Sequence, residues 1–113
     1  MKYTKEVKDG VLRLYFSGDL IGENNGPELV EIANDAITSG VIHCMLNISD
    51  VRYINSSGIG VLITLLTKFR NKNGELYIIQ PSTHVNKLLI MTKLQAIFNI
   101  AESEEEALQN IKN

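Results

Sequence analysis

The residues best suited to chemistry stand together at Asn55-Ser56-Ser57-Gly58. Asn and Ser favour the N-terminal cap of a helix, and an apolar helical pattern follows them. Two hydroxyls are therefore expected at the positive end of a helix, where free backbone N–H groups and the helix dipole stabilise a phosphate. The pattern predicts either a phosphate-bearing site or a helix cap with no further role.

The other reactive side chains offer little competing chemistry. His43 and Cys44 are neighbours in an apolar stretch that predicts a strand, so they point to opposite faces and cannot form a local metal pair. His84 falls in the first turn of a predicted helix, where a solvated position is expected. The sequence contains no Gly-rich phosphate loop and no CxxC, HExxH or G-x-S-x-G motif. We therefore expect no enzymatic activity, no metal site and no cofactor.

Composition excludes further classes of function. A net charge of −2, without a basic stripe interleaved with aromatic residues, argues against nucleic-acid binding. No apolar run approaches the roughly 18 residues that a membrane span needs, and the first residues lack the apolar core of a signal peptide. The single cysteine cannot form an internal disulfide. We expect a cytoplasmic protein without membrane insertion.

Strands are predicted from period-two patterning and from turn residues. Leu12, Leu14 and Phe16 alternate with more polar positions, and the Asp9-Gly10 pair before them favours a tight hairpin turn. A nearly continuous apolar run is typical of an inner strand. The expected strands cover residues 2–7, 11–17, 41–48, 75–80 and, at an edge of the sheet, 96–100.

Helices are predicted from 3.6-residue apolar spacing and from capping residues. Residues 18–26 are rich in turn formers and predict a loop, after which Pro27 suits the first turn of a helix. Ser82 is an N-cap candidate, and Ser103 forms a capping-box pattern with Glu106. The expected helices cover residues 27–40, 58–70, 82–91 and the segment after 103.

The order of these elements predicts an α/β fold. Strands that alternate with helices after an initial hairpin imply a mixed sheet of four to five strands, its inner strands parallel, with about four helices packed against it. No linker, repeat or low-complexity tract divides the chain. We expect one domain over residues 1–113.

The segment Leu46–Leu62 resembles the signature of bacterial anti-sigma factor antagonists, which are single STAS domains (sulfate transporter and anti-sigma factor antagonist). Members commonly show a strand ending in an apolar-Asp-apolar step, then Asp-Ser-(Ser/Thr)-Gly, then an apolar helix. Weaker matches occur at Ser17–Leu20, at Gly74 and at Ser103–Leu108. The resemblance implies a STAS fold over residues 1–113.

What the resemblance implies for function is a partner switch in transcription regulation. In this family the unphosphorylated domain binds a serine kinase that is also an anti-sigma factor, which releases the captive regulator. The kinase then phosphorylates the first serine of the motif and the complex breaks, until a phosphoserine phosphatase resets it. By position the phosphoacceptor is Ser56, and ATP belongs to the kinase. The free domain is expected to be a monomer whose partner-binding residues are Asn55, Ser57, Gly58, Ile21 and Gly22.

Three positions depart from the family pattern. Asn55 stands where Asp is usual, which keeps the capping oxygen and removes a charge. Ile21 stands where many antagonists carry an acidic or polar residue at the partner surface, and Asn47 stands where Asp is common. The alternative interpretation is a constitutive STAS interaction module, in a signalling complex or a membrane transport system, in which Ser56 and Ser57 serve only as caps.

Overall fold

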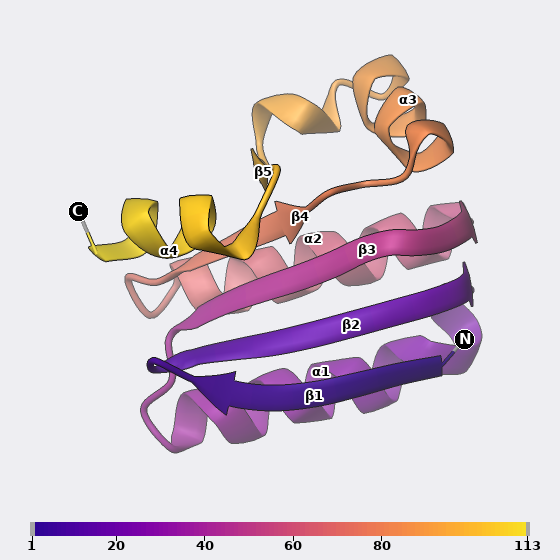
Figure 1. Ribbon diagram of the computed structural model, residues 1–113. Helices are drawn as coiled ribbons and strands as arrows, with labels where there is room; N and C mark the ends of the chain where they lie inside the picture. The colour runs from indigo at the N-terminus through magenta and orange to yellow at the C-terminus, as the bar shows by residue number, and fades with distance from the viewer. Residues whose placement is uncertain (1, 113) are drawn as a thin grey trace.

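A five-stranded mixed sheet forms the centre of the protein (Figure 1). The computed structural model describes residues 2–112. Its strands are β1 (Lys2–Lys8), β2 (Val11–Leu20), β3 (His43–Ile54), β4 (Glu75–Ile79) and β5 (Asn99–Ala101). Its helices are α1 (Gly22–Thr38), α2 (Ser56–Arg70), α3 (Thr83–Met91) and α4 (Glu104–Lys112), with a 3-10 turn η1 (Leu94–Ala96). This arrangement confirms the predicted fold class.

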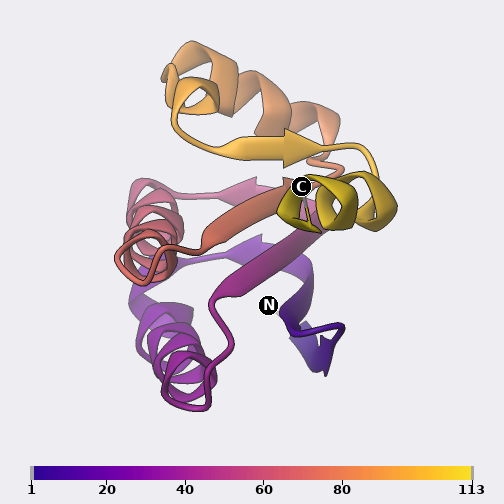
Figure 2. The ribbon, with the colours of Figure 1, turned by 90° about the vertical axis from the view of Figure 1, so that its left-hand side faces the viewer.

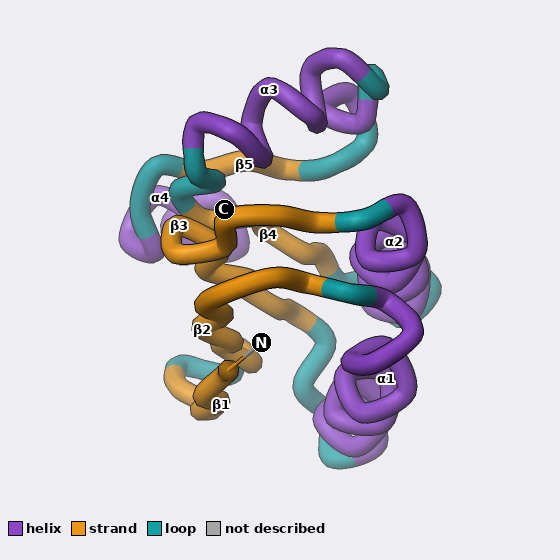
Figure 3. Tube along the Cα trace, turned by 90° about the vertical axis from the view of Figure 1, so that its right-hand side faces the viewer, coloured by secondary structure: helices purple, strands orange, loops and turns teal. Residues whose placement is uncertain are grey.

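The strands follow one another across the sheet in the order β1-β2-β3-β4-β5. β1 pairs antiparallel with β2, and the remaining pairs are parallel. Asp9 and Gly10 in the hairpin have φ values of 55° and 73°, as a tight turn with two left-handed residues requires. Helices α1 and α2 lie side by side on one face, α4 lies on the other, and α3 lies at the β5 end (Figures 2 and 3).

Two apolar clusters hold these layers together. The larger one joins the sheet to α1 and α2, and includes the fully buried Leu46, Leu62 and Phe69. The smaller one joins the other face to α4 through Met45 and Ala107. On β3, Cys44 and Leu46 belong to the larger cluster and Met45 between them to the smaller one, so the predicted inner strand is covered on both sides.

The last helix is fastened to β2 by a nearly buried arginine. Arg13 is 7 % exposed, and its Nη1 atom donates to Glu104 Oε1 at 2.7 Å. The Tyr15 hydroxyl donates to the same carboxylate at 3.1 Å. Burial first, and then Glu104, raises the pKa of Tyr15 to about 12. The acidic start of α4 therefore makes specific contacts in addition to its favourable place at a helix N-terminus.

Strands β2 and β3 are longer than predicted. They end at Leu20 and Ile54, whereas the sequence pattern placed their ends at residues 17 and 48. The parallel ladder continues from Ser17↔Asp50 to Leu20↔Ile54, with register irregularities on the way. Hydrogen bonding between the strands maintains the extended backbone there although the side chains are mostly polar.

The prediction of a loop over residues 18–26 was wrong. α1 begins at Gly22 and includes Pro27. Gly22 and Gly26 act as points of close approach to α2: a Cβ at Gly22 would lie 2.3 Å from the Ser57 carbonyl carbon, and one at Gly26 would lie 2.8 Å from Val61 Cγ2. Pro27 therefore lies in the second turn of α1 and not in the first turn as predicted, where it removes the hydrogen bond to the carbonyl four residues earlier and its ring crowds that carbonyl.

Smaller differences occur at other element ends. α2 begins at Ser56 instead of residue 58, and β5 covers 99–101 instead of 96–100, because residues 94–96 form η1. The predicted caps of α3 and α4 are present: Ser103 Oγ accepts from Glu106 N at 3.1 Å. In a capping box the Glu106 side chain would accept from Ser103 N, but here Glu106 Oε2 accepts from Glu102 N.

Candidate functional site

The turn between β3 and α2 is capped as the sequence predicted. Asn55 has extended backbone angles, and its side-chain Oδ1 accepts from Gly58 N at 2.7 Å. Its carbonyl accepts the helical hydrogen bond from Ile59 N at 3.0 Å. Ser56 and Ser57 are therefore the first two residues of α2, next to the unpaired N–H groups at its positive end.

The start of α1 joins this turn and completes the site. β2 and β3 end at the same edge of the sheet, so the helices that follow them begin beside each other (Figure 1). Asn55 Oδ1 also accepts from Gly22 N at 3.2 Å, and Asn55 Nδ2 donates to Glu23 Oε2 at 3.0 Å. The Ser57 hydroxyl donates to the second oxygen, Glu23 Oε1, at 2.6 Å. One carboxylate thus binds both neighbours of Ser56.

These hydrogen bonds change the acidity of the carboxylate. The bond from the Ser57 hydroxyl is the main cause that lowers the pKa of Glu23, followed by the residue's own backbone N–H and by Asn55. Glu23 is exposed and remains ionised at neutral pH. A fixed negative charge therefore lies against Ser57.

The two serines differ in environment although they are adjacent in sequence. Ser56 is exposed and Ser57 is partly buried. Within residues 2–112, the hydrogen bonds of this turn involve Asn55 and Ser57 and not the hydroxyl of Ser56. Ser56 therefore presents its hydroxyl to solvent, whereas the hydroxyl proton of Ser57 is already shared with a carboxylate.

The remaining predicted partner-binding residues lie at the same place and shape it. Gly22 and Gly58 are buried, and a Cβ at Gly58 would lie 2.6 Å from the Leu20 carbonyl oxygen. Ile21 is the N-terminal flanking residue of α1, and its carbonyl accepts from the amides of residues 24 and 25. The structure brings all six predicted site residues together, and their contact with a partner stays a prediction.

Two features of the site had no clear signal in the sequence. Glu23 looked like one of several loop carboxylates, because its contacts are with residues more than 30 positions away. The outward residues at the end of β3 form the rim: Tyr53 is 48 % exposed, and Arg52 makes an exposed ion pair with Asp19 at 3.4 Å. Arg52 and Tyr53 are consecutive and both exposed, so the strict alternation of a strand would not have placed both of them outward.

Outside the serine turn, the described residues include few side chains suited to catalysis or metal binding. Cys44 is fully buried, and burial raises the pKa of its thiol, which makes it unreactive. His43 Nδ1 accepts from Glu75 N at 3.1 Å, which is a structural role. Within residues 2–112 no group of three or more His, Cys, Asp or Glu side chains could hold a metal ion. In the same range no helix is both long and apolar enough to cross a membrane.

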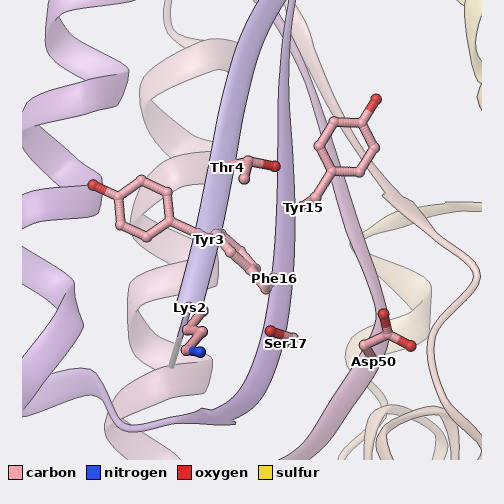
Figure 4. A pocket seen from close by; sticks show the side chains of 7 residues that line it. All are labelled: Lys2, Tyr3, Thr4, Tyr15, Phe16, Ser17 and Asp50. Carbon is pink, nitrogen blue, oxygen red and sulfur yellow. The ribbon is translucent and has the colours of Figure 1, made fainter.

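A hollow of about 200 Å³ lies on the β1–β3 part of the sheet, and its lining includes none of the residues of the serine turn (Figure 4). Thr4, Tyr15, Ser17 and Asp50 are among its lining residues. The Tyr15 hydroxyl is already bound to Glu104 and Glu6. The hollow therefore contributes no residue to the serine turn.

Known proteins are similar to this chain over most of its length. A protein of Bordetella bronchiseptica whose name describes it as an anti-sigma factor antagonist, BtrV, is 26 % identical over 112 residues, covering 99 % of this chain and 96 % of its own. An anti-sigma-B factor antagonist of Staphylococcus aureus is 28 % identical over 79 residues, covering 70 % and 73 %.

Solved structures share the fold. A Thermotoga maritima protein, 23 % identical, superposes with a TM-score of 0.88 and covers 98 % of this chain and 95 % of its own. The Bacillus cell fate determinant SpoIIAA in its phosphorylated form, 20 % identical, superposes with a TM-score of 0.74 and covers 97 % and 99 %. The STAS domain model matches residues 2–107, and this chain therefore belongs to the STAS domain family.

Proposed function

We propose that this protein is an anti-sigma factor antagonist that binds a serine-kinase anti-sigma factor and is switched off by phosphorylation of Ser56. Two curated relatives carry the name of antagonist. The observation that carries the assignment to Ser56 is its exposed, unengaged hydroxyl at the first position of α2, where the starts of two helices meet. The switch belongs to the bacterial cytoplasm, where the kinase binds the ATP that donates the phosphoryl group and a phosphatase removes it again.

In the proposed phosphoryl transfer this chain contributes only the nucleophilic hydroxyl. Ser56 Oγ attacks the γ-phosphorus of ATP held by the kinase, the bond to the bridging oxygen breaks, and ADP leaves. The hydroxyl proton goes to a base of the kinase. The protein supplies an accessible nucleophile on a rigid helix start, which removes much of the entropic cost of alignment.

The phosphorylated domain is expected to keep its fold. A phosphoserine adds about −1.5 to −2 charges at neutral pH. At the first turn of α2 that charge is near unpaired backbone N–H groups and the positive end of the helix dipole. The modification therefore acts on the docked surface more than on folding.

In the complex the same phosphate opposes docking. It must lose its hydration shell within the interface, and it stands beside Ser57, whose hydroxyl is bound to the ionised Glu23. A penalty of about 3 kcal/mol corresponds to a loss of affinity of roughly a hundredfold. Release of the anti-sigma factor then follows from phosphorylation without a large conformational change.

The structure also accounts for Asn55 in place of the usual Asp. The cap needs only an acceptor oxygen, which Asn55 supplies to two backbone amides. Its amide nitrogen faces Glu23, where an Asp would put a second carboxylate against the first. Asn at this position therefore fits a chain that carries Glu at position 23.

The test compares three variants in binding and phosphorylation. Ser56→Ala should keep affinity for the kinase and take no phosphate, and Ser56→Asp should bind more weakly. Ser57→Ala is the matched control and should still be phosphorylated on Ser56. Calorimetry with the host's candidate kinases gives the affinities, and mass spectrometry after incubation with ATP maps the site. Equal binding by all variants with no phosphate found would refute the proposal and favour a constitutive interaction module.

A further inference from the structure

Two adjacent serines face the same turn, and only one is free. Both hydroxyls are primary alcohols with the same intrinsic reactivity toward a phosphoryl donor. Ser57 Oγ lies 2.6 Å from Glu23 Oε1, whereas Ser56 is exposed. The difference between them therefore comes from their surroundings.

Glu23 is held in place by more than its contact with Ser57. Its second oxygen accepts from Asn55 Nδ2 at 3.0 Å, and Asn55 is itself fixed because its Oδ1 accepts from two backbone amides. Gly22 packs so closely against Ser57 that a Cβ would lie 2.5 Å from Ser57 Cβ, and this contact places the start of α1 next to that serine. The carboxylate is thus positioned before any partner binds.

Building on the proposed function, we infer that Glu23 is a positioning residue that restricts phosphorylation to Ser56 by withholding the hydroxyl of Ser57. For transfer to Ser57, its Oγ must approach the γ-phosphorus of a Mg-bound nucleoside triphosphate within about 3.5 Å. An Oγ–P bond would form, the bridging P–O bond would break, ADP would leave, and the hydroxyl proton would pass to a base of the kinase. The ionised carboxylate 2.6 Å from Oγ repels the anionic phosphoryl oxygens, and its hydrogen bond holds the hydroxyl toward α1.

The experiment measures where the phosphate goes. The unaltered chain, Ser56→Ala, and Ser56→Ala combined with Glu23→Gln or with Glu23→Ala are incubated with the cognate kinase and ATP, and site occupancy is read by mass spectrometry. Glu31→Gln is the control, because Glu31 is an exposed acid on the same helix. Far-ultraviolet circular dichroism verifies that each variant is folded.

The expected result is phosphate on Ser56 alone in the unaltered chain and in the control. Ser56→Ala should take none, and both double variants should take it on Ser57, with at least tenfold more than the single variant. Phosphate on Ser57 while Glu23 is intact, or none on Ser57 after its replacement, would overturn the inference and leave the proposed function standing. The single variant Glu23→Gln, incubated alongside, tests a merely structural role for Glu23, which would lower occupancy of Ser56 without moving phosphate to Ser57.

A measurement without a kinase separates the inference from the proposed function. Exchange of the Ser57 hydroxyl proton with water, followed by NMR, should be slow in the unaltered chain and at least tenfold faster in Glu23→Gln. Equal exchange in both would overturn the role given to Glu23. Absence of phosphate on Ser56 in the unaltered chain would overturn the proposed function, and the exchange rates would still decide the inference.

Discussion

Replacing Gly22 by Ala should destabilise the protein although alanine favours helices. The new Cβ would lie 2.3 to 2.5 Å from the Ser57 carbonyl carbon, carbonyl oxygen and Cβ, whereas ordinary contacts begin near 3.4 Å. Two of these atoms belong to the backbone, so one helix start must move by about 1 Å to make room. Gly60 offers the matched comparison, because it lies within α2 and a Cβ there meets nothing within 4 Å.

The change in the free energy of unfolding of Gly22→Ala follows from three contributions. Overpacking costs about 1–3 kcal/mol, and a contact with backbone favours the upper part of this range. Displacement also weakens the hydrogen bond from Gly22 N to Asn55, worth about 1 kcal/mol. The intrinsic preference of a helix for Ala over Gly offsets about 0.5–1 kcal/mol of this destabilisation. Gly22→Ala should therefore lower the free energy of unfolding by about 2–3 kcal/mol, and Gly60→Ala should raise it by about 0.5–1 kcal/mol.

Thermal and urea unfolding, followed by circular dichroism, measure both variants. For a chain of 113 residues, 1 kcal/mol corresponds to about 4 °C in Tm. Gly22→Ala should therefore melt about 8–12 °C below the unaltered protein, and Gly60→Ala about 2–4 °C above it. A Gly22→Ala protein that melts at or above the unaltered midpoint would show that the two helix starts do not touch.

Three further predictions concern the cap and the charged contacts. Asn55→Ala should cost about 1–2 kcal/mol in urea unfolding because α2 loses its cap, and Asn55→Ser should recover most of this cost. Arg13→Met should cost about 2 kcal/mol because Glu104 loses its cation, and a double-mutant cycle with Glu104→Met should show recovery. Because the pKa of Tyr15 is raised to about 12, its contribution to stability should be complete below pH 10 and lost as pH rises through 12. Tyr15→Phe should remove that part of the alkaline loss in urea midpoints, and an unchanged profile would contradict the assignment.

Sequence patterns were sufficient where the cause of structure is local. The alternation in residues 11–17 and the Asp9-Gly10 turn predicted the hairpin, and the capping preferences of Asn55, Ser56 and Ser57 together predicted that a helix starts at this turn. Parallel strands followed from the order of strands and helices. Each of these signals lies within a few residues of the feature that it predicts.

The errors occurred where distant parts of the chain determine structure. The ends of β2 and β3 remain extended because each strand bonds to the other, not because of their own residues. Gly22 and Gly26 looked like turn residues, because only the packing of α1 on α2 shows why a side chain is excluded there. The role of Glu23 was hidden for the same reason, since its two partners lie on another element.

The backbone contact between Gly22 and Ser57 affects how this end of the molecule can be recognised. Two segments about 35 positions apart present a single discontinuous epitope, and neither can shift without the other. A linear peptide covering residues 50–62 would carry both serines but lack Glu23, so the Ser57 hydroxyl would lose the carboxylate that it contacts in the folded chain. The folded chain instead displays one serine by shape, and a kinase or designed binder that reads this surface distinguishes native from unfolded protein.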